Sequence, residues 1–244
     1  MTPDGFAAEP WRLFLALAGP FVGTLAATWA VAWPRLPRPL WGGSACGRCG
    51  TPVPLWRQVP LISWALAKGG RRCCEGRIPW SYPLGEAAGL VVGLISGLLA
   101  ADGVEGTLRF LLGVTLIYAS LVDLRRYVIP VQAIAVVAML GVAGQAVKGD
   151  WPALSAGLTA AALTAAAFEA LRRVSALTRP SPALGAGDGL LAAALAVWLG
   201  PQTAMMVAIA AGLALVVQLT PTRRAVPAFG WALAVAGLGL VAAP

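Results

Sequence analysis

Long apolar runs separated by short polar breaks dominate this chain. Stretches long enough to cross a hydrocarbon core, which takes roughly 20 residues each, follow one another along it. The breaks fall at turn formers such as Gly200-Pro201 and Thr220-Pro221. The pattern predicts an all-α polytopic membrane protein with about eight transmembrane helices. Their expected starts lie near Trp11, Tyr82, Thr107, Val131, Trp151, Gly189, Gln202 and Val226.

The composition agrees with a membrane protein. Hydrophobic residues make up 59% of the chain and charged residues 11%, with a mean hydropathy of +0.78. Soluble domains carry about 25% charged residues. The formal net charge of +8 is explained by loops that face anionic membrane lipid, so nucleic acid is not an expected partner.

Basic residues alternate between the expected loops, and cytoplasmic loops carry the excess of Lys and Arg. This alternation predicts both termini outside, and it places Asp123 and Asp188 together at the cytoplasmic surface of the bilayer. The first long loop holds Arg35, Arg38, Arg48, Arg57, Lys68, Arg71, Arg72 and Arg77. Every second loop after it holds Arg125 and Arg126, then Arg172, Arg173 and Arg179, then Arg223 and Arg224.

Three regions are expected: a first transmembrane helix at 11–33, a cytoplasmic cysteine-containing loop at 34–81, and a membrane domain at 82–244. The first helix has a second interpretation as a signal peptide, because Ala30-Val31-Ala32 resembles a cleavage site. A signal peptide has a basic start, whereas the segment before this helix holds Asp4 and Glu9.

All four cysteines lie in the loop at 34–81. Cys46-Gly-Arg-Cys49 has the spacing of a zinc knuckle, whose thiolates converge on one tetrahedral ion. The second pair, Cys73-Cys74, is adjacent instead of spaced. We expect a structural zinc ion, because a small loop rich in Pro and Gly has too little core to hold itself. Free thiols in a reducing cytosol and a redox pair are the alternatives.

The chain contains no histidine, which excludes His-Glu-x-x-His zinc proteases and nucleophiles that need a histidine base. Acids within the apolar runs reduce to Glu86, Glu169 and the two aspartates. Carboxylates at a membrane edge are functional-site candidates, and two of them can share one proton and activate a water molecule. Asp123 and Asp188 are therefore the expected catalytic pair of an intramembrane aspartic protease.

Simpler roles exist for each acid. Asp188 is placed to cap the following helix, although Gly185 and Gly187 allow a closer backbone approach than a cap needs. Asp123 is placed to pair with Arg125 or Arg126 at the surface. Glu169 is expected to form an interfacial ion pair with Arg172 and Arg173. Glu86 is expected to support the substrate site or to make an interhelical hydrogen bond.

The motifs resemble those of the type IV prepilin peptidases, aspartic membrane proteases of the Gly-x-Gly-Asp kind. Asp123-Leu-Arg-Arg-Tyr-Val-Ile-Pro130 and Gly185-Ala-Gly-Asp188 resemble the two aspartate motifs of the family. Further segments resemble other parts of the family in the same order along the chain. These are Arg35-Leu-Pro37, Cys46-Gly-Arg-Cys49, Val59-Pro-Leu-Ile-Ser63, Tyr82-Pro-Leu-Gly-Glu86 and Val226-Pro-Ala-Phe-Gly230.

The resemblance implies a multi-pass enzyme of the bacterial inner membrane that cuts prepilins or pseudopilins of type IV pili or type II secretion at its cytoplasmic side. The cut falls between a short basic leader and the apolar helix of the pilin. It also implies N-methylation of the new amine with S-adenosylmethionine, an activity linked to the N-terminal loop. No glycine-rich nucleotide-binding motif locates that cofactor.

Two positions depart from the family pattern. Leu190 stands where the family commonly has a lysine two residues after the second aspartate. Arg71 stands where the family has the first cysteine of its second pair, so Cys74 fits the pattern and Cys73 is an extra thiol beside it. A non-catalytic or transport protein, with the two aspartates in ion pairs or a proton path, is the alternative function.

Overall fold

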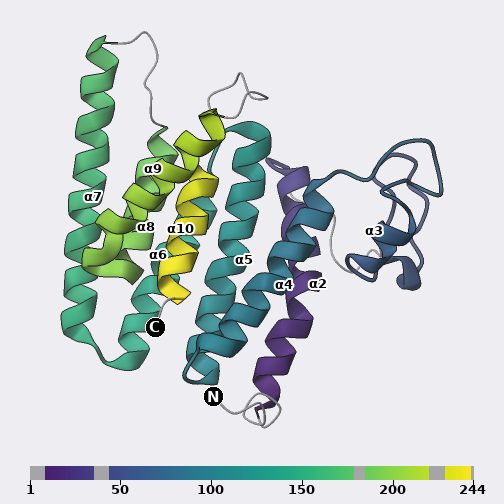
Figure 1. Ribbon diagram of the computed structural model, residues 1–244, viewed down its shortest axis with the longest axis horizontal. Helices are drawn as coiled ribbons and strands as arrows, with labels where there is room; N and C mark the ends of the chain where they lie inside the picture. Colours follow the sequence, from purple (N-terminus) through teal and green to yellow (C-terminus); the bar gives the residue numbers. More distant parts are fainter. Residues whose placement is uncertain (1–8, 36–43, 179–184, 220–228, 243–244) are drawn as a thin grey trace. The chain divides into compact units, whose positions relative to one another are not determined.

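The computed structural model describes residues 9–35, 44–178, 185–219 and 229–242 (Figure 1). Within these ranges the chain is helical and has no β-strand, which confirms the predicted all-α class. A short 3₁₀ helix, η2 (Leu55–Arg57), and a short helix, α3 (Ile62–Leu66), lie in the cysteine-containing loop. The longer helices are α2 (Pro10–Ala32), α4 (Ser81–Leu99), α5 (Gly103–Arg126), α6 (Val131–Lys148), α7 (Trp151–Thr178), α8 (Ala186–Leu199), α9 (Thr203–Leu219) and α10 (Gly230–Ala242).

The predicted helix starts agree with the structure to within a few residues. Six segments are long and apolar enough to cross a membrane, the last of them running through α8 and α9 together over Ala186–Ala214. The expected break at Gly200-Pro201 is present as the 3₁₀ turn η3 (Gly200–Gln202). The apolar run expected near Gly189 begins earlier, at Ala186. Several predicted features, Asp4, Arg38, Arg179, Arg223, Arg224 and the start of a helix at Val226, lie outside the described residues.

The chain divides into two compact units, Met1–Leu98 and Leu99–Pro244. The three regions expected from the sequence, with boundaries at 33/34 and 81/82, stay predictions. The N-terminal unit holds α2, the cysteine-containing loop and α4. The C-terminal unit holds α5 to α10, and with them both aspartates.

Glycines bring α2 and α4 of the N-terminal unit into backbone contact. A Cβ atom on Gly89 would overlap the carbonyl oxygen of Gly19, and one on Gly23 would overlap that of Gly85. Glycine recurs at every fourth position of α4, so the face of this helix that contacts α2 has no side chains at these positions. The repeat consists of Gly85, Gly89, Gly93 and Gly97.

Helix α8 lies at the centre of the C-terminal unit. The side chains of Leu191 and Leu195 are fully buried, in a cluster that draws on α5, α6, α9 and α10 as well. Trp198, near the end of α8, packs against this core, and its indole N–H donates to the Val137 carbonyl at 3.0 Å. By contrast, only 6% of the most apolar part of α7 is buried, as expected for a helix whose outer face meets lipid.

We expect Gly89→Ala to lower the stability of the protein by about 1–3 kcal/mol, because α2 and α4 must move apart to admit the added methyl group. Thermal unfolding in detergent measures the effect. Gly212→Ala on α9 is the matched control, since a Cβ atom there meets nothing within 4 Å. Equal melting temperatures for the two variants would contradict the close packing.

Candidate functional site

Asp123 lies inside α5, three residues before the helix ends. The sequence suggested that it follows the helix, at the surface. Instead its side chain is buried, with 4% of the residue exposed. Among the described residues, no ion pair within 4.0 Å joins it to Arg125 or Arg126, so the expected surface pairing is not formed. Tyr127, in the left-handed conformation at φ 57°, ends the helix directly after this turn.

The first turn of α10 holds the Asp123 carboxylate. The backbone N–H of Trp231 donates to Asp123 Oδ2 at 3.3 Å. Gly230 leaves the room for this contact, because a Cβ atom there would lie 2.8 Å from the same oxygen and 2.6 Å from Ile129 Cδ1. Since the N-terminus of a helix carries partial positive charge, the carboxylate meets a complementary dipole.

Asp188 is the third residue of α8, where the sequence placed it before the helix. Its Oδ2 accepts the backbone N–H of Gly185 at 3.1 Å, while its own N–H donates to the Gly185 carbonyl at 3.2 Å. The N-cap residue of α8 is therefore Gly185 and not Asp188, which bonds back to the N-cap backbone from the third helical position, as in a capping box. This bond uses one carboxylate oxygen, and the half-buried side chain retains a second oxygen for other partners.

Ile129 contacts residues next to both aspartates. Its buried side chain lies against Gly187, where a Cβ atom would be 3.2 Å from Ile129 Cβ, and also against Gly230. Ile129 thus contacts both the residue before Asp188 and the residue whose added Cβ atom would lie 2.8 Å from Asp123 Oδ2. The ends of three segments far apart in sequence therefore meet around two acids, each held by backbone N–H groups at the start of a helix.

Sequence reasoning did not identify Ile129, Gly230 or Trp231 as parts of this site. The motif beginning at Val226 was noted only as a resemblance, without a role. The sequence does hold a signal for the contact at Gly230. Phe229-Gly230 directly precedes an apolar run, and a glycine at the start of a helix permits close approach of another group. Leu190, at the position of the family lysine, is 50% exposed on α8.

Glu86 lies in the N-terminal unit and is 7% exposed. One carboxylate oxygen accepts the Thr24 hydroxyl of α2 at 3.1 Å, and the other accepts the backbone N–H of Leu61 at 2.7 Å. This is the interhelical bond considered from the sequence, extended to the loop before α3. A role for Glu86 in supporting substrate stays a prediction. Glu169 makes the expected ion pairs with Arg172 and Arg173, both at 2.7 Å.

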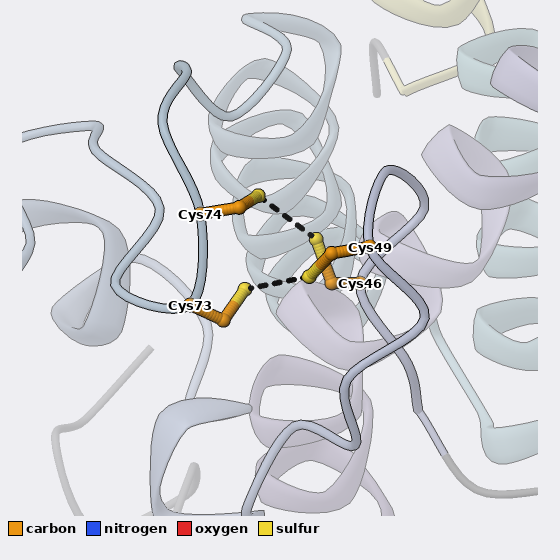
Figure 2. A group of neighbouring side chains, drawn as sticks. All are labelled: Cys46, Cys49, Cys73 and Cys74. Atoms are coloured by element: carbon orange, nitrogen blue, oxygen red, sulfur yellow. Dashed lines mark hydrogen bonds between the residues drawn. The ribbon is translucent and has the colours of Figure 1, made fainter.

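The four cysteine thiols come together in one cluster (Figure 2). Cys46 Sγ lies 3.8 Å from Cys74 Sγ, and Cys49 Sγ lies 3.5 Å from Cys73 Sγ. All four sulfur atoms lie within 4.8 Å of one another. Four thiolates around one zinc ion at 2.3 Å stand about 3.8 Å apart, so the cluster fits a tetrahedral metal site.

Two turns present these thiols, and each is tied by a bridge between short extended segments. Ala45 bridges to Pro52 around the first pair, and Gly70 bridges to Arg77 around the second. Gly76, at φ +135°, allows the second turn to close so that both adjacent cysteines face the cluster. The structure therefore brings in Cys73, the thiol that the family pattern left unexplained.

The surroundings shift the pKa values of the thiols in opposite directions. The backbone N–H groups of Cys49 and Arg48 lower the pKa of Cys46 to about 6, so its thiolate forms readily. Hydrogen bonds to Cys49 and then Cys46 raise the pKa of Cys73 to about 12. Metal ligands must be deprotonated, so an ion bound here has to displace the Cys73 proton, and its affinity falls as pH falls.

Comparison with known proteins covers most of the chain. Residues 17–100 match the bacterial peptidase A24 N-terminal domain, and residues 110–219 match the type IV leader peptidase family. No solved structure matches the chain.

Several named relatives are similar over long stretches. The type 4 prepilin-like proteins leader peptide-processing enzyme of Escherichia coli O78:H11 is 28% identical over 81% of this chain and 74% of its own length. The prepilin leader peptidase/N-methyltransferase of Klebsiella pneumoniae is 28% identical over 86% of this chain and 97% of its own length. For the protein of that name in Pectobacterium carotovorum, the identity is 27% and the chain spans only 58% of the relative.

We expect the purified protein to carry about one zinc ion per chain, and Cys73→Ser and Cys74→Ser each to lose most of it, because both thiols belong to the cluster. Metal analysis of the dialysed proteins measures this. Ser44→Ala, in the same loop but bonded to Gln58, is the control and keeps its metal. Full zinc content in Cys73→Ser would show that Cys73 is not a ligand.

Proposed function

The chain belongs to the type IV leader peptidase family, and from that premise we propose that it is an aspartic endopeptidase that removes the leader peptide from type IV prepilins or pseudopilins. The observation that supports this proposal most is that Gly187, beside Asp188, and Gly230, beside the Asp123 carboxylate, both pack against Ile129. Both acids stand at helix ends, and each accepts a backbone N–H at the start of a helix. Two carboxylates with different protonation states can supply the acid and the base that hydrolysis of a peptide bond by water needs, without a histidine.

The proposed reaction is general acid–base hydrolysis. Two neighbouring carboxylates do not both ionise easily, so one holds a proton while the other is charged. The charged carboxylate takes a proton from water as the water oxygen bonds to the scissile carbonyl carbon. The protonated carboxyl donates a hydrogen bond to the carbonyl oxygen and stabilises the negative charge that develops there. Collapse of the tetrahedral intermediate breaks the C–N bond, and the leaving nitrogen receives the proton that the base had taken.

In this proposal the backbone orients the two carboxylates, and the carboxylates react. The N–H groups of Trp231 and Gly185 hold one oxygen of each acid and fix the direction of the carboxylates. In this proposal the second oxygen of each acid faces the attacking water or the substrate during the reaction. We place this site at the cytoplasmic face of the bacterial inner membrane, and the excess of basic residues in the adjoining loops supports that side.

A second activity, N-methylation of the new N-terminal amine with S-adenosylmethionine as the methyl donor, is part of the proposal. Its support is the names of relatives, among them the Klebsiella protein that this chain matches over 97% of its length. No residue of this chain is assigned to the methyl donor. We further propose that the cysteine cluster holds a structural zinc ion, because the loop residues that the structure describes bury almost no core of their own.

Family membership favours the peptidase over a non-catalytic or transport protein. The site geometry favours it too, since Asp123 has no arginine partner within ion-pair distance among the described residues. A purely structural ion pair would need such a partner once buried.

Asp123→Asn and Asp188→Asn should each reduce leader cleavage by about 10²–10⁴-fold or more, because each removes a proton-transfer group while keeping shape. A gel-shift assay of prepilin cleavage by the detergent-purified proteins measures the rate. Asp150→Asn is the control, since this residue only caps α7 through the Ala153 N–H, which asparagine does equally well. Cleavage at the wild-type rate by either site variant contradicts the proposal.

Gly230→Ala should lower kcat for cleavage by a factor on the order of 10², with little change in KM, because its methyl group displaces the Asp123 carboxylate. Gly239→Ala on the same helix is the control, as a Cβ atom there meets nothing within 4 Å. Both variants should melt close to wild type. If Gly230→Ala keeps full kcat, the first turn of α10 does not position Asp123.

A further inference from the structure

The loop between α2 and α4 carries large apolar side chains on its surface. Leu55 is 83% exposed and Trp56 is 64% exposed in η2, while Ile62 and Leu66 of α3 are 59% and 70% exposed. Ile62 and Leu66 stand four residues apart, so they share one face of the short helix. We call residues 55–66 the interfacial segment. Apolar exposure of this extent in a segment outside the spans marks a surface that meets something other than water.

The depth of this segment is set by Glu86. The bond from the Leu61 N–H to Glu86 ties the start of α3 to a residue five positions into α4. At 1.5 Å per residue this point lies about 7.5 Å from the beginning of α4. The 19 residues of α4 extend about 28 Å, close to the whole thickness of a hydrocarbon core. If α4 spans the core, the start of α3 lies within about 7.5 Å of the headgroup boundary, on its acyl side.

The backbone accepts an unusual conformation to make this bond. Leu61 has φ +61°, a region that residues with a side chain rarely adopt. Such strain persists only where surrounding contacts hold it, and here the contact is a carboxylate that also bonds Thr24 of α2. The interfacial segment is thus fixed against the ends of the helices and does not extend freely into water.

The charge of the loop complements an anionic surface. Arg57 stacks over the Trp56 ring at 4.5 Å, which places a cation directly beside an exposed aromatic residue. Trp side chains prefer the boundary between headgroups and acyl chains, and basic residues beside them attract anionic lipid. The described loop residues carry one acid, Glu75, against the cations Arg48, Arg57, Lys68, Arg71, Arg72 and Arg77.

We propose that the interfacial segment lies in the lipid headgroup region at the end of α2 and α4, and that it binds anionic phospholipid. Its apolar side chains enter the acyl boundary, and Arg57, Lys68 and Arg72 contact lipid phosphates. The loop that holds the cysteine cluster is thereby anchored to the bilayer at a third point, besides its two helix connections. This proposal is independent of the peptidase activity and of the metal.

The test uses the full chain in nanodiscs of phosphatidylcholine alone or with about one third phosphatidylglycerol. Lipids brominated near the headgroup quench tryptophans at that depth, and aqueous iodide quenches tryptophans in water. The signal of Trp56 is the difference between wild type and Trp56→Phe. We expect quenching of Trp56 by the brominated lipid to be about twofold stronger in the anionic discs, with little quenching by iodide.

Charge variants separate local binding from a general effect of net charge. Lys68→Gln/Arg72→Gln should abolish the difference between the two lipid compositions, whereas Lys148→Gln/Arg173→Gln, with the same loss of charge elsewhere, should retain it. Strong iodide quenching of Trp56 with no effect of bromine in either disc overturns the proposal. So does bromine quenching that is equal in both discs, or protection of Trp56 that requires an added prepilin, which would identify a protein-binding surface.

Discussion

Close approach of backbones, which glycine alone permits, is the constraint on which this structure depends. In a membrane, helices gain little from burying apolar side chains against one another, so close packing supplies much of their association. Gly89 allows α4 to pack closely against α2. Gly157 does the same for α7 and α8, since a Cβ atom added to it would lie only 2.5 Å from the Val197 carbonyl oxygen. Gly230 has the same property at the candidate site, because it lets the start of α10 approach Asp123.

In the proposed function, the two aspartates combine a structural role and a chemical one in the same side chains. Capping and catalysis appear as competing interpretations of Asp188 when only the sequence is considered. In the structure one oxygen of Asp188 accepts the Gly185 N–H at the start of α8, and that bond also fixes where the other oxygen points. Asp123 is held in a comparable way by α10. Backbone dipoles thus do the orienting that a histidine or a metal ion does in other hydrolases.

Periodicity and turn formers were enough to predict the helices, and the motifs singled out the two aspartates and the four cysteines as candidates. The burial of Asp123 was not predictable in this way, because the apolar run gives the length of a helix but not which of its faces meets α10. The approach of Trp231 to Asp123 joins residues 108 positions apart, a contact that spacing does not encode. Cys73 likewise joins the cluster because of the turn at Gly76, a conformational property of the backbone.

Helix α7 provides a measure of depth for the aspartate site. Its 28 residues extend about 42 Å, whereas a hydrocarbon core is about 30 Å thick. The charged group of Glu169, Arg172 and Arg173 begins about 27 Å from Trp151, so we infer that the membrane boundary lies near Phe168. Phe168 packs on Gly189, next to Asp188. With the boundary at this level, Asp188 would lie close to it, and the last turns of α7 would extend beyond it into water.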